Sequence, residues 1–417
     1  MKNVSVQKKL DWISILLYAL LVIAGWLNIY SASLPAETTS IFDINQIYGR
    51  QLIFIGITIP LIILLLSIDS KFYEKYALIF YIIGLLSILG LFVFGKSVKG
   101  QTNWYQIGGF GIQPSEFVKT TTALLLAKYL ADNQGTLNTL KEQIIALGII
   151  GLPTLLILKH DTGSAMLFVS LIFVLYREGL PSWYLWTGFI TILLFVSSLI
   201  IEPYIIISCI IIVSLIHFYF NKKINRNPII YTILAVVMSS FVYSVDYVYD
   251  NVLEPHQKDR INVLIGEEVN LQAEGYNLNQ SKIAIGSGSW TGTGFLEGTQ
   301  TKGGFVPEQH TDYIFTTVGE EWGFAGASVV IILFVCLFFR LLYLAENQKK
   351  RFNRVYGYCV VSFLFIHFAF NITMLIGLFP TIGVPLPFFS YGGSSLIAFT
   401  VLLFIFLKLD ANKINDW

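Results

Sequence analysis

Residues 313–344 read YIFTTVGEEWGFAGASVVIILFVCLFFRLLYL, and this mostly apolar stretch decides the class of the protein. A helix needs about 20 apolar residues to cross the hydrocarbon core of a bilayer, and this stretch is longer than that. Backbone polar groups in lipid must be satisfied within the segment itself, so we expect a helix and not a soluble strand. The stretch therefore predicts a membrane-spanning segment.

Similar apolar stretches recur along the whole chain. Hydrophobic residues make up 55% of the sequence and charged residues only 13%, with a mean hydropathy of +0.68, whereas a soluble domain carries about 25% charged residues. We predict an all-α, polytopic integral membrane protein with about twelve transmembrane helices. The predicted cores are Trp12–Ala32, Tyr48–Ser67, Tyr76–Gly95, Pro114–Ala131, Ile144–Leu158, Thr162–Tyr176, Trp183–Ile201, Pro203–Phe220, Pro228–Val248, Tyr313–Leu344, Val355–Phe379 and Phe389–Lys408.

The basic residues of the short loops set the predicted orientation. Cytoplasmic loops carry an excess of Lys and Arg, so we expect both termini on the cytoplasmic side and the long loop of residues 251–311 outside. The 27 basic residues are balanced by 26 acidic ones, which excludes a nucleic-acid partner because no clustered basic face results. The predicted inner segments hold Lys8, Lys9, Lys71, Lys75, Lys222, Lys223, Arg226, Lys349, Lys350, Arg351 and Arg354.

The chain reads as one membrane domain over residues 1–417. Glu202 and Pro203 indicate a tight outer turn, and the basic stretch 221–227 indicates the matching inner turn, so residues 203–248 look like an added helical hairpin. We expect the first apolar stretch to remain a helix and not to be a cleaved signal peptide, because it is longer than the apolar core of such peptides.

The first group of unusual polar residues stands at the start of the span 114–131. Glu116 and Lys119 share a helix face, and ionisable residues in a membrane cost on the order of 2.5–3.5 kcal/mol each at the helix centre. Two interpretations fit: an interfacial ion pair that anchors the helix end, or a site in which the lysine binds a pyrophosphate. Gln113 and Ser115 adjoin the pair, and the nearby Trp104 is either an aromatic-belt anchor or a platform for a sugar.

The second group closes the long outer loop. Thr311 and Asp312 are ordinary N-cap residues under one interpretation. Under the other, Asp312, Thr316 and Glu320 follow at intervals of four and line one helix face well into the span, which capping does not explain. We therefore expect this stripe to line a cavity or pathway, and Glu308 and His310 belong to the same group.

The third group lies between the last two spans. Residues 379–387 read FPTIGVPLP and predict non-helical backbone near membrane depth, which is tolerated only where protein or water covers it. A stiff turn is one explanation. A cavity lining is favoured because small and hydroxyl residues cluster directly after it, at Ser390, Tyr391, Gly392, Gly393, Ser394 and Ser395.

Three further features remain open at this level. The segment that holds Gln280, Ser281, Lys282 and the glycines from Gly286 to Gly294 fits no nucleotide motif and reads as a flexible flap, in which Lys282 is expected to meet phosphate. Asp161 stands at another outer helix end, where packing is an equally good account. The histidines show no second ligand at metal spacing, so we expect His217, His256 and His367 to be structural.

Taken together, these motifs resemble the SEDS family (shape, elongation, division and sporulation) along nearly the whole chain. Residues 113–116, QPSE, look like its first signature, and residues 160–165, HDTGSA, are similar to its Pro-Asp-Leu-Gly-Thr-Ala motif. The outer segments 280–288, 298–300 and 307–312 resemble the rod-shape member more than the division member, and residues 389–395, FSYGGSS, resemble the last family motif.

The resemblance implies a peptidoglycan glycosyltransferase that polymerises lipid II at the outer face of the bacterial cytoplasmic membrane, for cell elongation and shape. A class B penicillin-binding protein that crosslinks the strands is the implied partner. The family has about ten helices, so the surplus is the hairpin 203–248. The chain has Asn103 where the family often has Arg, which puts a role for a cation there in doubt.

The family's catalytic position is occupied here by Asp312, which we expect to act as the base that takes the proton of the acceptor hydroxyl. Lys119, with Lys282 or a divalent cation, is expected to hold the departing diphosphate; no cofactor is certain, and a metal requirement stays open. The expected substrate-binding residues are Lys119, Glu116, Gln113, Ser115, Trp104, Asp161, Lys282, Glu308, His310, Thr311, Glu320, Ser390, Gly392, Gly393 and Ser394.

Two rival functions fit part of the pattern. Intramembrane charges and a broken helix also suit a transporter or flippase of lipid-linked precursors. A non-catalytic scaffold for a cell-wall synthase is the other alternative. The gathering of polar residues on one side favours the enzyme, because a translocation pathway should show polar groups on both sides.

Overall fold

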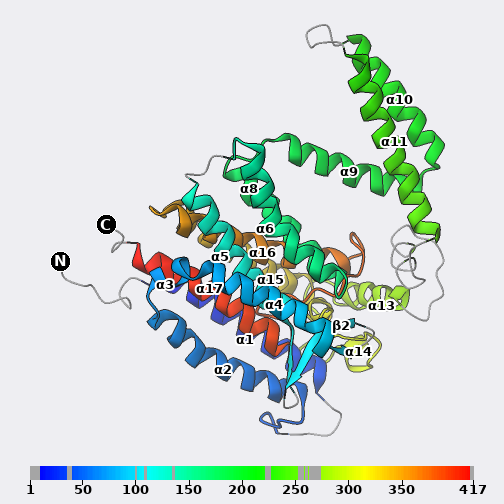
Figure 1. Ribbon diagram of the computed structural model, residues 1–417. Helices are drawn as coiled ribbons and strands as arrows, with labels where there is room; N and C mark the ends of the chain where they lie inside the picture. The colour runs from blue at the N-terminus through cyan, green and yellow to red at the C-terminus, as the bar shows by residue number, and fades with distance from the viewer. Residues whose placement is uncertain are drawn as a thin grey trace. The chain divides into compact units, whose positions relative to one another are not determined.

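The computed structural model describes residues 10–34, 40–98, 101–107, 110–133, 137–220, 227–251, 258, 262 and 274–413. The chain divides into two compact units, whose elements are labelled in Figure 1. Unit 1 comprises Met1–Leu180 and Asn277–Trp417, and unit 2 comprises Pro181–Tyr276. The stretch between Leu180 and Asn277 therefore forms a unit of its own.

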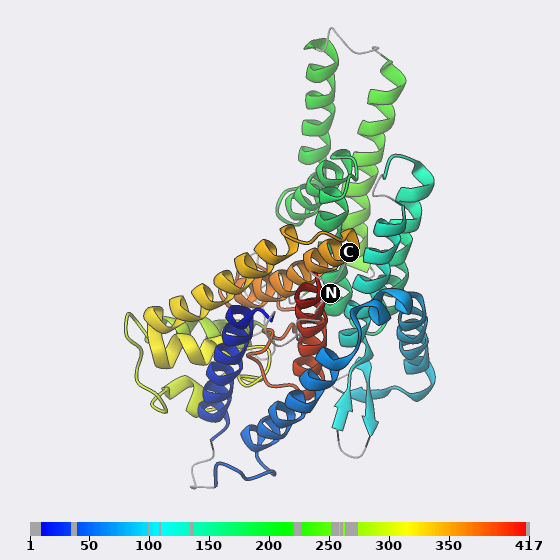
Figure 2. The same ribbon diagram turned by 90° about the vertical axis from the view of Figure 1, so that its left-hand side faces the viewer.

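Each predicted apolar stretch is helical in the structure. Unit 1 holds the helices of the candidate site, and Figures 1 and 2 show them side by side. They are α1 (Trp12–Ser33), α2 (Ile47–Ser67), α3 (Ser70–Lys75), α4 (Ala77–Phe94), α5 (Pro114–Asp132), α6 (Leu140–Leu158), α7 (Thr162–Leu167), α8 (Leu171–Arg177), α13 (Glu274–Ser287), α14 (Thr299–Lys302), α15 (Ile314–Glu346), α16 (Arg351–Leu375) and α17 (Gly393–Asn412).

The protein is a multi-pass membrane protein. Ten of the helices in the described part of the chain are long and apolar enough to cross a membrane. The predicted spans 114–131 and 162–176 are not among the ten. Helix α5 is long enough but carries four charged side chains, at Glu116, Lys119, Lys128 and Asp132, and the second stretch is divided into α7 and α8 by a 3₁₀ turn at Phe168–Ser170. The count of twelve spans stays a prediction.

The all-α prediction missed a small antiparallel sheet between α4 and α5. Strands β1 (Lys96–Val98), β2 (Gln101–Ile107) and β3 (Phe110–Ile112) pair in that order, with Lys96 opposite Trp104 and Tyr105 opposite Ile112. The sheet is the cyan element of Figures 1 and 2. Because its strands are short, no apolar periodicity announced it.

Helix α17 forms the centre of unit 1. In its apolar window 89% of the residues are buried, against 22% in α2 and 28% in α4. The outward faces of α2 and α4 carry large apolar side chains such as Ile63, Leu64 and Phe94, whose exposure suits a lipid environment. Unit 1 therefore has a protein-packed centre and a lipid-suited periphery.

Helix α15 is broken at Gly323, whose φ of +61° and ψ of −161° leave the helical range. Four backbone hydrogen bonds of 2.9–3.1 Å join residues 289–294 to residues 320–325 across this break. Gly292 has a φ of +84°, and a Cβ on it would stand 2.0 Å from the Glu321 carbonyl oxygen, so only glycine fits. The glycine-rich segment is thus a packed strap, and the prediction of a flexible flap is wrong for residues 289–294.

Polar contacts tie together the helix ends that were predicted to lie inside. The Arg340 guanidinium of α15 donates to Asp11, which caps α1 by accepting from the Ser14 amide at 2.9 Å. In the turn between α15 and α16, Gln348 Nε2 donates to Asp410 Oδ1 of α17 at 2.6 Å. The start of α1, the basic turn before α16 and the end of α17 therefore share one end of unit 1.

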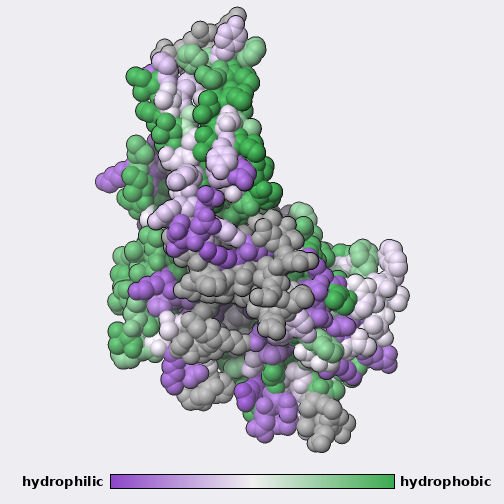
Figure 3. All heavy atoms as spheres, turned by 90° about the vertical axis from the view of Figure 1, so that its right-hand side faces the viewer, coloured by the Kyte–Doolittle hydropathy of each residue, from purple (hydrophilic) through white to green (hydrophobic). Residues whose placement is uncertain are grey.

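Unit 2 consists of α9 (Trp183–Ile200), α10 (Pro203–Phe220) and α11 (Pro228–Asn251). Leu194, Ile206 and Val242 form its buried cluster, and α10 and α11 lie side by side, with mostly hydrophobic side chains at the top of Figure 3. The hairpin predicted at 203–248 is thus present as two helices, while its turn at 221–226 lies outside the described residues. Its surplus status remains a prediction.

The predicted long outer loop is described only in part. Most of residues 252–273 lie outside the described residues. From residue 274 onward the segment is not a plain loop, because it contains α13 and α14.

Candidate active site

Asp312 stands just before α15, at the end of the segment 307–313. Helix α15 begins at Ile314 with Tyr313 as its N-cap, so the interpretation of Asp312 as a simple capping residue is wrong. Its side chain is half-buried, and a Cβ built on Gly383 would lie 3.3 Å from its Oδ2. The carboxylate therefore faces the segment 376–392 that joins α16 to α17.

The segment before α15 is bonded to the segment before α17. Ser390 Oγ donates to the carbonyl of Thr311 at 2.7 Å and accepts from the Leu386 amide at 2.9 Å. The Tyr391 amide donates to the carbonyl of His310 at 2.9 Å, and the two rings meet edge to face at 5.7 Å. The second and third polar groups of the sequence therefore form one site.

Glu308 and Thr311 shape the start of this site. Glu308 has a φ of +55°, and its Oε2 accepts from Thr311 Oγ1 at 3.1 Å. Burial raises the pKa of the Tyr391 hydroxyl above its usual value, although Arg50 acts in the opposite direction. Glu308 thus contributes a turn held by Thr311, and His310 packs against the neutral phenol of Tyr391.

The Glu116–Lys119 pair is buried among three helices. Lys119 Nζ donates to Glu116 Oε1 at 2.8 Å and lies 2.6 Å from Nε2 of His367 on α16. The ammonium also stands 5.0 Å from the ring centre of Phe399 on α17. Only 1% of the Lys119 surface and 3% of the Glu116 surface is exposed.

This burial corrects both interpretations of the pair. It is not an interfacial anchor, because it is enclosed by α5, α16 and α17, and its ammonium does not face an outer cavity. His367 was expected to be structural, yet it completes the cluster. The signal that would have found it is the one applied to Lys119: an ionisable residue inside a predicted span needs a partner.

Asp161 connects the sheet, α5 and α7. Its Oδ2 accepts from Gln113 Nε2 at 3.0 Å, from Asn103 Nδ2 at 3.3 Å and from Ser164 Oγ at 2.6 Å. Its Oδ1 accepts from the Ser164 amide at 3.0 Å, so Asp161 is the N-cap of α7. Because Asp161 also accepts hydrogen bonds from Gln113 and Asn103, capping is only part of its role.

Gln113 connects Asp161 to the last family motif, residues 389–395. The Gln113 amide donates to Ser394 Oγ at 3.0 Å, at the first turn of α17. Ser115 lies buried in the first turn of α5, and its Oγ has no hydrogen-bond partner among the described residues. The start of α5 is thus fixed on two sides.

Gly392 and Gly393 lie against α2. The Gly392 amide donates to Gln51 Oε1 at 3.3 Å. A Cβ on Gly393 would stand 2.3 Å from a ring carbon of Phe54, so the glycine permits a close approach of the two helices. These contacts show a packing function for both positions.

Trp104 and His160 stand on the sheet side of the site. The Trp104 ring is half-buried and covers Gly111, whose Cβ would lie 2.8 Å from it. His160 Nδ1 lies 3.0 Å from Thr102 Oγ1, and partial burial together with the nearby Lys159 lowers the pKa of His160. The imidazole of His160 is therefore neutral at pH 7. For Trp104, the choice between a belt anchor and a sugar platform stays open.

The polar stripe of Asp312, Thr316 and Glu320 was expected to line a cavity, but Thr316 and Glu320 do not line one. Thr316 is fully buried, and its Oγ1 lies 2.7 Å from Ser281 Oγ of α13. Glu320 is fully buried, and its carboxylate accepts from the amides of Gln300 and Thr301 at 2.7 and 2.9 Å. Beyond Asp312 the stripe is therefore a packing face for α13 and α14, with both residues tied to the outer segment.

The Glu320 contacts make a stability prediction. Glu320→Ala leaves two buried amides of α14 without their acceptor, so we expect a loss of about 1–3 kcal/mol in unfolding free energy. Glu297→Ala, which truncates an exposed glutamate of the same segment, should cost less than about 0.5 kcal/mol. Thermal unfolding in detergent and proteolysis of residues 293–303 measure the difference, and equal melting of both variants would contradict the assignment.

Lys282 lies on α13 at the end of α16. Its side chain is exposed, and a Cβ on Gly377 would lie 2.4 Å from its Nζ, which places the ammonium beside the 376–392 segment. A contact of Lys282 with phosphate stays a prediction. Within the described residues, no group of three or more His, Cys, Asp or Glu side chains could hold a metal ion.

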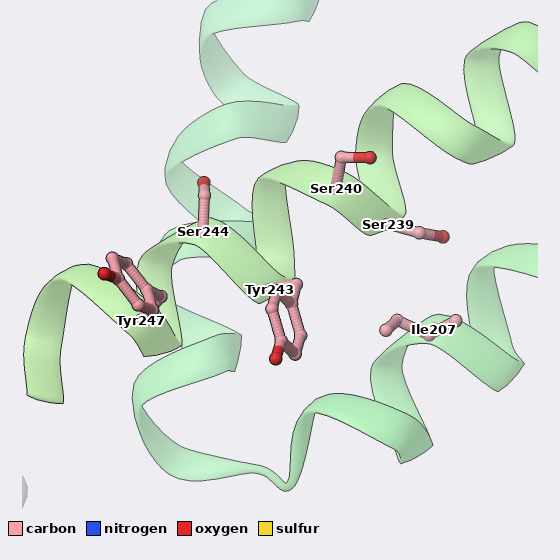
Figure 4. Close-up of a pocket in the computed structure, with 6 residues that line it drawn as sticks. All are labelled: Ile207, Ser239, Ser240, Tyr243, Ser244 and Tyr247. Atoms are coloured by element: carbon pink, nitrogen blue, oxygen red, sulfur yellow. The ribbon is translucent and has the colours of Figure 1, made fainter.

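Two pockets are lined by residues other than those predicted for the site. One, of about 480 Å³, lies within unit 2 and is lined by Ile207 of α10 and by hydroxyl residues of α11 (Figure 4). A second, of about 540 Å³, adjoins it along the same two helices. The hydroxyl residues of the first pocket are Ser239, Ser240, Tyr243, Ser244 and Tyr247.

A family model of cell cycle proteins, FtsW/RodA/SpoVE, matches the chain over residues 11–209 and 189–415. The match therefore covers nearly the whole chain in two segments. The segments overlap across residues 189–209, in α9 and the first part of α10.

Curated relatives match over most of their length. The chain is 30% identical to the peptidoglycan glycosyltransferase MrdB of Escherichia coli K12 over 396 residues, which is 94% of this chain and 93% of MrdB. It is 28% identical over 436 residues to the peptidoglycan glycosyltransferase RodA of Treponema pallidum, covering 97% and 98%. It is 27% identical over 415 residues to a probable peptidoglycan glycosyltransferase FtsW of Aliivibrio salmonicida, covering 98% and 90%.

Solved structures share the fold. A chain from work on how a peptidoglycan synthase complex coordinates polymerization and crosslinking superimposes with a TM-score of 0.72 at 22% identity, covering 98% of this chain and 99% of that one. The rod shape determining protein RodA of Thermus thermophilus superimposes with a TM-score of 0.64 at 21% identity, covering 98% of each chain. At these identities the likeness establishes the architecture.

Proposed function

The chain belongs to the FtsW/RodA/SpoVE family of cell cycle proteins, and from this premise we propose that it is a peptidoglycan glycosyltransferase that polymerises lipid II into glycan strands for cell elongation and shape. The observation that carries the proposal is the meeting of Asp312 with the 376–392 segment, beside the starts of α5 and α17. This is one end of unit 1, and the basic helix ends lie at the other.

The proposed reaction joins two lipid-linked sugars. The acceptor hydroxyl oxygen attacks the anomeric carbon of the donor, the bond from that carbon to the diphosphate breaks, and Asp312 takes the hydroxyl proton. The half-buried carboxylate suits this role because it has an open side and a fixed backbone. Developing negative charge on the diphosphate needs a cation nearby.

Lys282 is the better-placed cation for the diphosphate. Its ammonium is exposed beside the 376–392 segment, whereas the Lys119 ammonium is enclosed and bonded to Glu116 and His367. We propose that Lys282, with or without a divalent ion, contacts the diphosphate. Lys119 then acts on the site through the helices that surround it.

The charge distribution supports the orientation. Short loops rich in Lys and Arg stay in the cytoplasm, so the end with Lys349, Lys350 and Arg351 is inside and Asp312 is outside. The proposed location is the bacterial cytoplasmic membrane with both termini inside. A class B penicillin-binding protein is the proposed partner, in line with the solved structure from a peptidoglycan synthase complex.

The hairpin of α10 and α11 is proposed as the addition to the family core. The proposal rests on the predicted count of about twelve spans against about ten in the family, and not on the family match, whose second segment, residues 189–415, runs through both helices. Unit 2 also separates from unit 1 as its own compact body.

Polymerisation of lipid II by the purified protein, with its penicillin-binding partner bound and with a transpeptidase inhibitor present, tests the proposal. Glycan strands that depend on the protein are expected. Movement of labelled lipid across liposomes without new glycan bonds would instead establish a flippase. No strands and no movement, with the partner shown to be bound, would establish a scaffold.

A further inference from the structure

Helix α16 carries two buried polar side chains one turn apart, His367 and Asn371. Both have 0% exposure, and residues four apart lie on the same helix face. A polar side chain in a membrane-spanning helix is costly unless it is bonded, so the pair needs partners. Their partners belong to the candidate site.

Asn371 uses its side-chain amide group on two segments that are far apart in the sequence. Its Nδ2 donates to the carbonyl of Asp312 at 2.8 Å and to the carbonyl of Val384 at 2.8 Å. An amide group has two N–H donors, so one side chain satisfies both carbonyls. Asn371 thereby holds the backbone of Asp312 and the backbone next to Gly383 at a fixed separation.

This separation matters because Gly383 faces the carboxylate. A Cβ on Gly383 would lie 3.3 Å from Asp312 Oδ2, and Gly383 has a φ of +66°. A shift of either segment would therefore move the carboxylate relative to the wall that it faces. Asp312 lies outside α15, which begins only at Ile314.

His367 holds the next carbonyl of the same segment. Its Nε2 lies 2.6 Å from the Lys119 ammonium, which can only donate, so the ring proton is on Nδ1. Nδ1 then donates to the carbonyl of Pro385 at 3.3 Å. The adjacent carbonyls of Val384 and Pro385 are thus both bonded to α16.

We propose that Asn371 is a positioning residue for glycosyl transfer, which sets the Asp312 carboxylate against the Gly383 segment through its two hydrogen bonds. This inference rests on the proposed function, because it assigns Asn371 to the reaction of the same site. Misplacement of a catalytic group by about 1 Å can cost on the order of 100-fold in rate. The contribution of Asn371 should accordingly appear in kcat.

The test compares Asn371→Leu and Asn371→Asp with Thr373→Val, all in the full chain with its partner. Leu removes both donors at similar volume, and Asp keeps the shape but offers carboxylate oxygens to two carbonyls. Thr373 is the matched control, because its Oγ1 donates within its own helix, to the Ala369 carbonyl at 2.6 Å. We expect kcat for lipid II polymerisation to fall about 10- to 100-fold in both Asn371 variants, with KM changed less than about twofold and Thr373→Val near wild type.

Hydrogen exchange on the same proteins supplies a readout that does not depend on activity. Loss of the two bonds should speed amide exchange in residues 309–313 and 382–388 together, while exchange in α17 stays unchanged. Unchanged exchange in both segments would overturn the proposal, whether or not the wild-type protein makes glycan strands. Absence of strands from the wild-type protein would be the failure of the proposed function. Faster exchange with unchanged kcat would also overturn it, because the segments would then be held for folding alone.

A double variant separates positioning from general structural support. In an Asp312→Asn background, Asn371→Leu should lower the residual rate by less than about twofold, because there is no carboxylate left to place. An undiminished further loss of 10-fold or more would show that Asn371 acts elsewhere. If Asn371→Leu fails to fold, the Asn371→Asp variant carries the same comparison.

Discussion

We expect Asp312→Asn to lower the rate of glycan-strand formation by the purified protein roughly 10²–10⁴-fold, the range that a general base contributes. The amide has the shape of the carboxylate but cannot take a proton from the acceptor hydroxyl. The hydrogen bond from Asn371 goes to the main-chain carbonyl of Asp312, so the substitution leaves it in place. Gel analysis of strands made from lipid II, with the partner bound, measures the effect.

Asp132→Asn is the matched control for this prediction. Asp132 is exposed at the opposite end of α5, and its change should leave the rate within about twofold of wild type. Equal melting temperatures would show that Asp312→Asn is folded. Strands formed at the wild-type rate by the Asn variant would remove Asp312 as the base while leaving the family's activity untouched.

Lys119→Met has the largest expected effect on stability, about 3–5 kcal/mol, because it leaves the Glu116 carboxylate buried without its cation. Glu116 is 3% exposed, and its Oε1 accepts from the lost ammonium. The His367 Nε2 atom would lose its donor in the same change. Thermal or denaturant unfolding in detergent gives the loss of unfolding free energy.

The double variant Glu116→Gln with Lys119→Met distinguishes a missing partner from a missing side chain. It removes both charges, so it should recover much of the stability that the single variant loses. Lys128→Met, a half-buried lysine of the same helix, is the control and should cost less than about 1 kcal/mol. A single variant as stable as this control would show that the pair is not buried in solution.

The identity of the polar residues was readable from the sequence, but their partners were not. Ionisable groups in apolar spans pointed to Glu116 and Lys119, and intervals of four pointed to Asp312, Thr316 and Glu320. The structure separates this second set: Asp312 faces the 376–392 segment, whereas Thr316 and Glu320 bond to α13 and α14. A helical interval fixes a shared face, yet it does not say what covers that face.

His367 and Asn371 show the same division from the other side. Both stand in a predicted span; the rule that flagged Lys119 would have flagged His367, whereas Asn371 is polar but not ionisable. The role of His367 depends on Lys119, 248 positions away in the chain, and that of Asn371 depends on Asp312, 59 positions away. No local sequence pattern predicts such contacts.

The sequence by itself determined that the protein crosses a membrane many times, where its helices lie and which family motifs it carries. It could do so because span length, apolar composition and turn residues are local properties that the bilayer and the backbone impose directly. Only the tertiary structure decided that Lys119 is enclosed, that the glycine-rich strap replaces the broken bonds of α15, and that Asn371 joins Asp312 to Val384. These depend on which helix faces pack together, and buried polar groups take whichever partners that packing brings within hydrogen-bond distance.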